Sequence, residues 1–286
     1  MANKCLSLAL HGGAGVLARR EYGPELAHLR GVVEAGRDRL RAGVAALDVV
    51  VEAVAALEAS GLYVAGRGAS PSSAGRFELD ASLMDGPSRR AGAVAALVGF
   101  AAPIRAARAV MEKTPHALLA GEGAAAFALA QGLERVGPEW FTPVPRAGAP
   151  RLETGTVGCV ALDEAGALAA ATSTGGVFGK LAGRVGDSPI PGAGVWADEN
   201  VAVSCTGVGE YFLRTAAAAQ VALRMRLAGE DVDAAAAAAL ADVASLGGSG
   251  GLIALTARGD LALPFSTPGM KRAWLAPDSS IGAAVF

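Results

Sequence analysis

The sequence is poor in the residues that build disulfide frameworks and zinc sites. Cysteine occurs three times in 286 residues, as Cys5, Cys159 and Cys205, and no two form a Cys-x-x-Cys pair. An odd, widely spaced set argues against a disulfide framework and against a structural zinc site. We therefore expect a protein of a reducing compartment, the cytoplasm, that folds through its apolar core.

Histidine is equally scarce, and this limits the kinds of catalysis to consider. The three histidines are His11, His28 and His116, and none lies near a serine in a G-x-S-x-G pattern. His28 falls in a charged helical stretch and is expected to be solvated, and His116 follows Thr114-Pro115 at a helix boundary. A serine nucleophile with a histidine base is therefore not expected.

Long apolar runs and clusters of basic residues are also missing. No window offers the roughly 18 uninterrupted apolar residues of a membrane span, and the first apolar run, 5–10, is too short for a signal-peptide core. The formal net charge is -2 and the basic residues are dispersed, without the footprint of a nucleic-acid or membrane-binding surface. We expect a small-molecule partner, no nucleic acid and no membrane.

The chain alternates between segments with the periodicity of strands and segments with the periodicity of helices. Hydrophobic residues make up 52% of it, enough to build a large core. Strands are expected at 6–10, 77–84, 92–100, 157–163, 168–173, 201–205, 252–256 and 261–265. Helices are expected at 25–41, 44–59, 104–111, 121–131, 210–228 and 232–245. A proline-rich stretch at 137–151 without periodicity indicates an exposed linker. The pattern predicts one layered body of sheets with outer helices, whose linker crosses its surface.

Two glycine-rich segments invite a phosphate-binding interpretation. The loop from His11 to Gly15 follows a strand but lacks the G-x-G-x-x-G spacing, so a tight turn is favoured over an anion cradle. The segment 174–181 ends in Gly-Lys, but a P-loop requires glycine at Thr174 and serine or threonine at Leu181. Neither segment predicts a nucleotide site.

Two other loops carry candidate chemistry. Arg184 and Asp187 share one glycine-rich loop, where a guanidinium and a carboxylate suit the two charges of an amino acid. A surface ion pair is the alternative. Thr206 and Gly207 follow a strand and precede a helix, where a hydroxyl and a backbone amide can stabilise an oxyanion. Helix capping by Thr206 is the alternative there.

Taken in order, seven segments carry a resemblance to a known family: "LHGGAG", "ELDASLMDG", "GTVGCVALD", "ATSTGG", "GRVGDSPIPGAG", "SCTGVGE" and "ALPFSTPGMKRAW". The chain resembles the plant-type asparaginases, also called isoaspartyl or β-aspartyl peptidases, of the N-terminal nucleophile hydrolase class. The resemblance covers essentially the whole chain. It implies an α+β fold, the four-layer αββα sandwich of that class, as a single domain over 1–286.

The resemblance further implies a precursor that cuts itself between Gly155 and Thr156. Residues 1–155 would become one subunit and 156–286 the other, and the family pattern implies a homodimer of such pairs. Glycine before the threonine tolerates a strained backbone at the scissile bond. Cleavage frees the α-amine of Thr156, which can act as the base for its own hydroxyl, so that no histidine is needed.

Position in the matching motifs implies the remaining roles. Thr174 would hydrogen-bond the nucleophile, while Thr206 and Gly207 would form the oxyanion hole. Arg184 would hold the substrate α-carboxylate, and Asp187 with Gly209 its α-amine. No cofactor is implied for catalysis. The family also carries a structural sodium bound by backbone carbonyls, which places the expected ligands at Leu57, Glu58, Ser60, Tyr63, Ala65 and Arg67.

The chain departs from the family pattern at Val64, Gly179 and Ser266, where asparagine is usual, and at Val208, where a polar residue is usual. These changes leave open the preferred leaving group and the efficiency of self-cleavage. One alternative is a glycosylasparaginase-like amidase, which shares "GRVGDSPIPGAG" but is normally secreted and does not open with "LHGGAG". The other is a cleavage-dead relative that binds amino acids or acts as a scaffold.

Overall fold

The computed structural model describes residues 6–17, 20–143 and 155–286. Its strands are β1 (Ser7–His11), β2 (Glu78–Asp85), β3 (Ala91–Val98), β4 (Leu118–Ala120), β5 (Val157–Leu162), β6 (Leu168–Thr174), β7 (Val195–Ala197), β8 (Val201–Gly207), β9 (Gly250–Thr256), β10 (Leu261–Ala262), β11 (Arg272–Leu275) and β12 (Ile281–Ala284). Its helices are α1 (Gly23–Arg41), α2 (Ala46–Ala59), α3 (Pro103–Lys113), α4 (Gly121–Ala130), α5 (Gly209–Thr215), α6 (Ala217–Leu223) and α7 (Val232–Ser245), with short helical turns η1 (Gly66–Gly68), η2 (Pro138–Trp140) and η3 (Arg224–Ala228).

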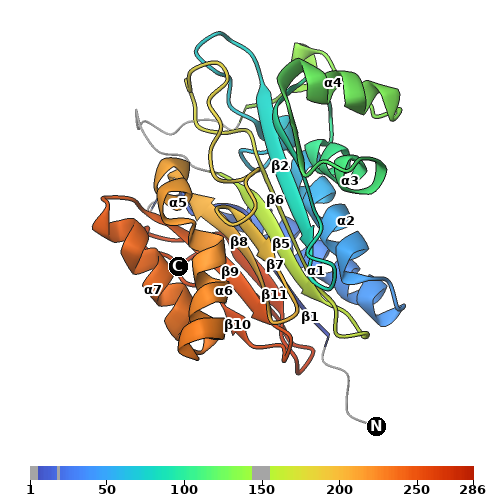
Figure 1. The fold of residues 1–286 in the computed structure, drawn as a ribbon. Coiled ribbons are helices and arrows are strands. Elements are labelled where there is room, and N and C mark those ends of the chain that lie inside the picture. The colour runs from blue at the N-terminus through green and yellow to red at the C-terminus, as the bar shows by residue number, and fades with distance from the viewer. Residues whose placement is uncertain (1–5, 18–19, 144–154) are drawn as a thin grey trace.

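The strands form two sheets, a larger mixed one and a smaller antiparallel one (Figure 1). The larger has eight strands in the order β12-β11-β1-β5-β6-β2-β3-β4, and the smaller has four in the order β10-β9-β8-β7. All neighbours are antiparallel except β3 and β4, which run parallel. Strands β5 and β6 therefore lie in the middle of the larger sheet, next to β1.

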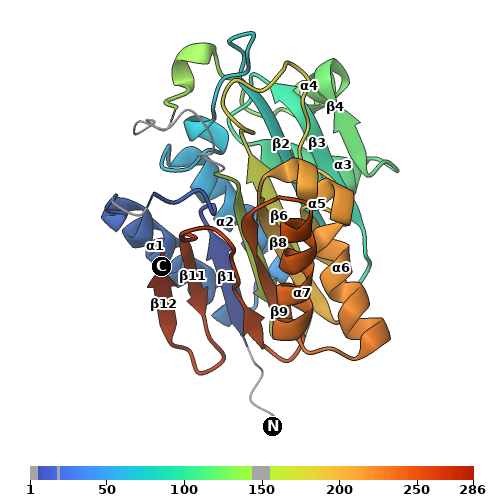
Figure 2. The ribbon, with the colours of Figure 1, turned by 90° about the vertical axis from the view of Figure 1, so that its left-hand side faces the viewer.

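The two faces of β1 and β5 pack against different partners. Leu8, Leu10 and Cys159 belong to the core cluster shared with α1, α2 and α3, whereas Ala9 and Val160 belong to the cluster shared with the smaller sheet. This alternation follows from the two-residue period of a strand. Helices α6 and α7 pack on β8 and β9 of the smaller sheet, on the other side of the molecule from α2 (Figures 1 and 2).

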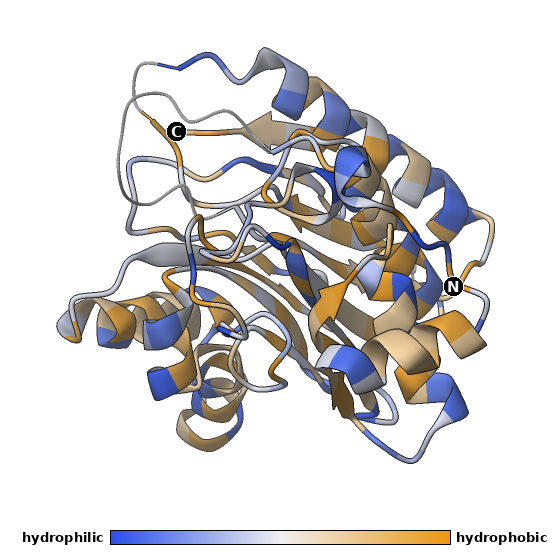
Figure 3. Cartoon of the chain, turned by 90° about the horizontal axis from the view of Figure 1, so that it is seen from above, coloured by the Kyte–Doolittle hydropathy of each residue, from blue (hydrophilic) through white to orange (hydrophobic). Residues whose placement is uncertain are grey.

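Helix α1 is amphipathic, as its sequence predicts. In α1 the side chains of Leu29, Val33 and Leu40 are buried while the charged residues between them face outward. Hydrophilic and hydrophobic residues accordingly alternate along the helices in Figure 3. Within the described parts of the chain, none of the helices combines the length and the apolarity needed to cross a membrane.

The described part of the expected exposed linker, 137–143, is mostly exposed but is attached to the body at one point. The turn η2 leads into Phe141, which is buried and stacks on Phe77 with ring centroids 4.2 Å apart, while Trp140 meets Phe141 edge-on. These three aromatic rings attach the segment to the body because they bury apolar area together. Residues 144–151 of the expected linker lie outside the described residues.

The single helix expected at 210–228 is divided. Ala216 adopts a left-handed conformation (φ 49°, ψ 46°) between α5 and α6, and the last turn, η3, is a π-helix. Alanine periodicity alone does not reveal such a break. The expected hairpin is confirmed by the pairing of Leu261 with Leu255, but it does not end the fold because β11 and β12 follow.

Candidate active site

Three strand ends from the two sheets meet at one edge of the molecule. Thr156 directly precedes β5 and Thr174 ends β6, and because these strands pair antiparallel through Val157 and Ser173, the two threonines are neighbours. Their hydroxyl oxygens lie 3.3 Å apart, within hydrogen-bonding distance. Strand β8 of the smaller sheet ends beside them at Gly207.

One narrow pocket collects most of the residues that the sequence singles out. It is lined by Gly155, Thr156, Thr174, Arg184, Asp187, Gly207 and Gly209, among others. Its volume is about 10 Å³, which is room for about one water molecule and too little for an amino acid. Gly155 itself forms part of the pocket wall.

Thr206 is near this pocket without lining it. Its side chain is fully buried between the two sheets, and its Oγ1 accepts a hydrogen bond of 3.2 Å from the backbone N–H of Ala14. That bond occupies an acceptor lone pair and leaves the hydroxyl proton available for donation. The helix-capping alternative does not apply, because Val208 stands at the cap of α5, where no side-chain hydrogen bond is made.

Arg184 and Asp187 bring opposite charges to the pocket from one loop. The Arg184 guanidinium makes a two-point contact with Glu210, at 2.8 and 2.9 Å. Asp187 is buried, and its Oδ2 has no hydrogen-bond partner among the described residues. Burial raises the pKa of Asp187 to about 7, and nearby Glu210 and Asp80 act in the same direction, whereas Arg184 lowers it. Such a carboxyl is suited to a cationic partner.

The loop that carries Arg184 and Asp187 is attached to β2 by two hydrogen bonds to Glu78. Lys180 is buried and its Nζ donates to the carbonyl of Glu78 at 2.8 Å, while the N–H of Gly183 donates to the Glu78 carboxylate at 2.9 Å. Asp80, opposite Thr174 in the sheet register, is buried nearby. Burial lowers the pKa of Lys180 and raises that of Asp80, and their mutual attraction opposes both shifts.

Two glycines of the site allow close approaches that a side chain would prevent. A Cβ on Gly209 would lie 2.7 Å from Oδ1 of Asp187 and 3.1 Å from the guanidinium of Arg184. A Cβ on Gly155 would lie 2.5 Å from both Cβ and Cγ2 of Val64. The spacings of 2.7 and 2.5 Å are shorter than real Cβ contacts, so a side chain at either position would force its neighbours to move.

Sequence reasoning missed His11, which the structure brings to the nucleophile candidate. The ring lies at the end of β1, fully buried, with Nδ1 3.1 Å from the carbonyl oxygen of Thr156 and Nε2 2.9 Å from Oγ of Ser204. The expectation of a tight turn after the strand holds for Gly13, whose φ is 96°. The available signal was a histidine closing a fully buried strand, an unusual place for this residue.

The loop expected to bind sodium is a compact turn between α2 and η1. The carbonyls of Tyr63 and Ala65 each accept one backbone N–H, which leaves each of them a second lone pair, whereas the Leu57 carbonyl accepts both the N–H and the hydroxyl of Ser60. Gly61 and Gly66 have positive φ angles, and the missing Cβ of Gly68 leaves space in front of the Gly61 and Tyr63 carbonyls. The donor chemistry fits a hard monovalent cation. Among the described residues, no cluster of three His, Cys, Asp or Glu side chains could hold a metal.

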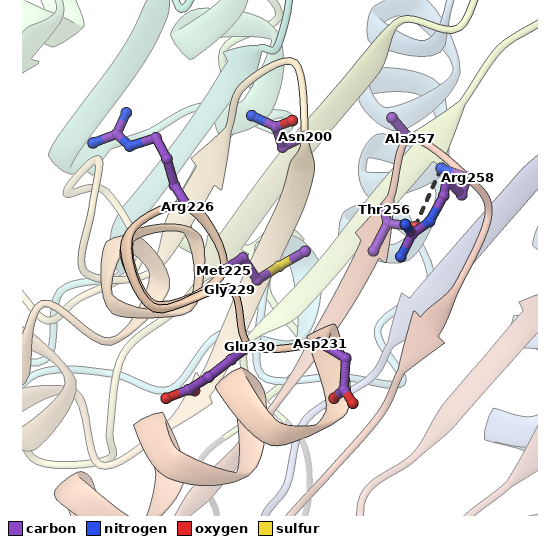
Figure 4. A pocket seen from close by; sticks show the side chains of 9 residues that line it. All are labelled: Asn200, Met225, Arg226, Gly229, Glu230, Asp231, Thr256, Ala257 and Arg258. Carbon is purple, nitrogen blue, oxygen red and sulfur yellow. Dashed lines mark hydrogen bonds between the residues drawn. The ribbon is translucent and has the colours of Figure 1, made fainter.

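A roomier pocket, of about 570 Å³, lies at the opposite end of the smaller sheet (Figure 4). It is bordered by Asn200, just before β8, and Thr256, the last residue of β9. Figure 4 shows its charged side chains, Arg226, Glu230, Asp231 and Arg258, pointing in different directions, so they do not converge on one ligand. None of the residues singled out by the sequence lines it.

Comparison with known proteins identifies the family. The model of the family described as Asparaginase matches residues 4–147 and 144–283. An isoaspartyl peptidase of Salmonella typhimurium is 48% identical, covering 93% of this chain and 94% of the relative. An isoaspartyl peptidase of Escherichia coli is 47% identical over 93% and 92%. A plant-type L-asparaginase of Pyrobaculum calidifontis is 42% identical over 95% and 97%. The chain belongs to this asparaginase family.

Proposed function

We propose that the protein is a hydrolase that cleaves the side-chain amide of L-asparagine and the isopeptide bond of β-aspartyl dipeptides, through an ester on Thr156. The observation that carries the proposal is the meeting of Thr156, Thr174, Arg184 and Asp187 in one pocket. The substrate class is taken from the names of the relatives, isoaspartyl peptidase and plant-type L-asparaginase.

The first reaction is a single self-cleavage. The Thr156 hydroxyl attacks the carbonyl carbon of Gly155, and an N-to-O acyl shift moves the Gly155 acyl group from nitrogen to oxygen. Water then hydrolyses the ester, which leaves a carboxylate on Gly155 and a free amine on Thr156. The short distance between the Thr156 and Thr174 hydroxyls supports the role of Thr174 in orienting the attacking oxygen. Residues 1–155 and 156–286 become separate subunits.

Departure of Gly155 from the pocket wall opens the site for substrate. The free amine of Thr156 takes the proton from its own hydroxyl, and Oγ1 attacks the β-carbonyl carbon of the substrate. Thr206, whose proton is available, and the N–H of Gly207 are the donors to the oxyanion. Ammonia or an amino acid leaves with the returned proton, and water hydrolyses the β-aspartyl ester.

The loop after β6 supplies the substrate clamp. Arg184 binds the α-carboxylate, because a guanidinium matches a carboxylate in two-point geometry. Asp187 receives the α-ammonium, which gives its unpartnered Oδ2 a cationic partner, and Gly209 adds a backbone contact. Both charges of a free amino acid are thereby matched, whereas a residue inside a normal peptide lacks them.

The same proposal covers the remaining properties. The packing of helices and sheets is the αββα sandwich of N-terminal nucleophile hydrolases, folded as one domain. Catalysis needs no cofactor. The loop between α2 and η1 holds a structural sodium through the backbone carbonyls of Leu57, Glu58, Ser60, Tyr63, Ala65 and Arg67. The processed pairs associate as a homodimer, and the enzyme acts in the cytoplasm.

Intact mass measurement of the purified protein tests the proposal. We expect two fragments with the boundary between Gly155 and Thr156, and hydrolysis of asparagine or β-aspartyl dipeptides after cleavage. Thr156→Ala should remain one chain without activity, while Thr114→Ala, at a threonine in the loop after α3, should be cut normally. A wild-type chain that stays whole and inert on long incubation would contradict the proposal and favour a cleavage-dead, amino-acid-binding protein.

A further inference from the structure

A chain of buried polar groups connects the interior of the two sheets to the carbonyl of Thr156. Thr172 on β6 lies 2.6 Å from Ser204 on β8, oxygen to oxygen, and Ser204 lies 2.9 Å from Nε2 of His11 on β1. Nδ1 of the same ring lies 3.1 Å from the Thr156 carbonyl oxygen. All of these side chains are fully buried. Buried polar groups of this kind are retained where they fix a specific geometry.

With a neutral imidazole, one arrangement of protons gives every contact of this chain a donor. A carbonyl oxygen can only accept, so Nδ1 of His11 carries the proton. Burial lowers the pKa of His11 to about 3, and the nearby Lys271 acts in the same direction, so the ring is neutral and Nε2 accepts from the Ser204 hydroxyl. Ser204 has then used its single proton and accepts from Thr172.

If Thr172 donates to Ser204, the Gly194 carbonyl still has a hydrogen-bond donor. The Thr172 hydroxyl is within donating distance of both the Gly194 carbonyl, at 3.0 Å, and Ser204, at 2.6 Å. Because the Gly194 carbonyl already accepts the N–H of Cys205 at 2.9 Å and Ser204 is closer, we assign the Thr172 proton to Ser204. The donors run from Thr172 through Ser204 and His11 to Thr156.

Gly158 makes room for the chain. It stands opposite His11 in the register of β1 and β5, two residues after the nucleophile candidate. A Cβ at this position would overlap both Oγ of Ser204 and Nε2 of His11. The second glycine of "GTVGCVALD" thus has a packing reason, which is to let an imidazole and a hydroxyl meet beside β5.

We propose that His11 is a positioning residue for Thr156, which it holds by a hydrogen bond from Nδ1–H to the Thr156 carbonyl in a tautomer fixed by Ser204 and Thr172. The inference rests on the proposed function of Thr156 and deepens it. Once the bond to Gly155 is cut, Thr156 is a chain end. His11 then holds its carbonyl, Thr174 its hydroxyl, and β5 its following residue.

The tautomer is a readout independent of activity. In ¹⁵N-labelled Thr156→Ala protein, which keeps the backbone carbonyl and stays uncut, long-range ¹H–¹⁵N correlation should give His11 the pattern of a neutral Nδ1–H ring. The pattern should not change between about pH 5 and pH 8, where exposed imidazoles titrate. The spectrum of the same protein with His11→Asn assigns the signals. An Nε2–H ring or an imidazolium would overturn the proposal even if the enzyme is fully active.

Two substitutions separate the two ring nitrogens. The amide nitrogen of asparagine stands as many bonds from Cα as Nδ1, and that of glutamine as many as Nε2. His11→Asn therefore keeps the donor to Thr156, and His11→Gln loses it. We expect His11→Gln to lower kcat by about 100-fold, with KM within about twofold, and His11→Asn to recover at least about tenfold of that loss.

Ser7→Ala is the matched control on the same strand. The Ser7 hydroxyl is also buried and donates to a backbone carbonyl, that of Leu275 at 2.9 Å, but it lies at the other end of β1. It should lower thermal stability as the His11 variants do and leave kcat unchanged. Equal kcat in wild type, His11→Asn and His11→Gln would overturn the positioning role. Equal losses in the two His11 variants would also overturn it, since the donor would not be what matters.

Discussion

The backbone of Gly155 lies against Val64 so closely that no side chain fits between them. A Cβ on Gly155 would come within 2.5 Å of Cβ and Cγ2 of Val64. Val64 is itself held, because its carbonyl accepts the N–H of Gly175 at 2.8 Å. The position where the family usually has asparagine is thus an apolar wall behind the bond proposed to be cut.

This contact predicts a compensating pair of substitutions. In the uncut Thr156→Ala background, Gly155→Ala should lower the free energy of unfolding by about 1–3 kcal/mol through overpacking. Val64→Gly, which removes both contacting carbons, should recover part of that loss in the double variant. Urea denaturation measures the coupling. Strictly additive costs would show that the two positions do not press on each other in solution.

Glu210 prepares Arg184 for the substrate. Its carboxylate holds the guanidinium by two hydrogen bonds, although half of the Glu210 side chain is exposed. We expect Arg184→Lys to raise KM by at least about tenfold, because an ammonium cannot make the two-point contact. Glu210→Gln should raise KM by a smaller factor and leave kcat within about twofold. Steady-state kinetics with a β-aspartyl dipeptide tests both, and an unchanged KM in Arg184→Lys would remove Arg184 from the clamp.

Protonation of Asp187 should lower kcat/KM on the acidic side of the pH profile. Burial raises the pKa of this carboxyl from 3.8 to about 7, and only its ionised form pairs with an ammonium. We expect kcat/KM to fall below about pH 7 as the free enzyme is protonated. This fall should be weaker in kcat, since bound substrate stabilises the carboxylate. In Asp187→Asn, kcat/KM should be low and should not show this fall. A wild-type profile flat from pH 5 to pH 7 would contradict the assignment.

The same carboxyl should affect stability in the direction opposite to an ordinary ion-paired aspartate. Its pKa is higher in the folded than in the unfolded chain, so the folded state binds more protons between pH 3.8 and about 7. The free energy of unfolding contributed by Asp187 is then fully present below pH 3.8 and is lost as pH rises through about 7. Thr156→Ala protein should show this slope in urea denaturation, and Asp187→Asn in the same background should remove it.

Lys180 and Asp80, both buried beneath the substrate loop, should interact electrostatically, because each opposes the pKa shift that burial causes in the other. Lys180→Met removes this cation and the donor to the Glu78 carbonyl, which should lower the free energy of unfolding by about 1–3 kcal/mol. Asp80→Asn with Lys180→Met should cost less than the sum of the two single changes. Urea denaturation of the four proteins measures the cycle. Full additivity would show that the two groups do not interact.

The sequence predicted the central elements because long segments carry clear periods. Helices at 25–41 and 44–59 and the strands around 157–163 and 168–173 are confirmed within a few residues, and the family membership is confirmed by the comparisons. The short strands β4, β7, β11 and β12 were not predicted. They have three or four residues each, too few to show a period, and pairing with a neighbouring strand, not their own composition, makes them strands.

The sequence names the residues of the candidate site but not their geometry. Thr156, Arg184 and Asp187 could be named from motifs, whereas the inward direction of Thr206 toward Ala14 depends on how the two sheets face each other. The hydrogen bond of His11 to Thr156 joins residues 145 positions apart. Only strand register brings them together, and register is a tertiary property.

The order of strands in the larger sheet has a consequence for the life of the processed enzyme. Strands β1 to β4 precede residue 156 and strands β5, β6, β11 and β12 follow it, yet β5 and β6 lie between β1 and β2. After cleavage the strands of the two chains would therefore alternate within one sheet. The chains could not dissociate unless the hydrogen bonds of that sheet were broken. Folding of the precursor is a first-order event, but refolding after cleavage requires two molecules to meet. The cut enzyme should consequently recover from denaturation at a rate that depends on concentration, and poorly when dilute.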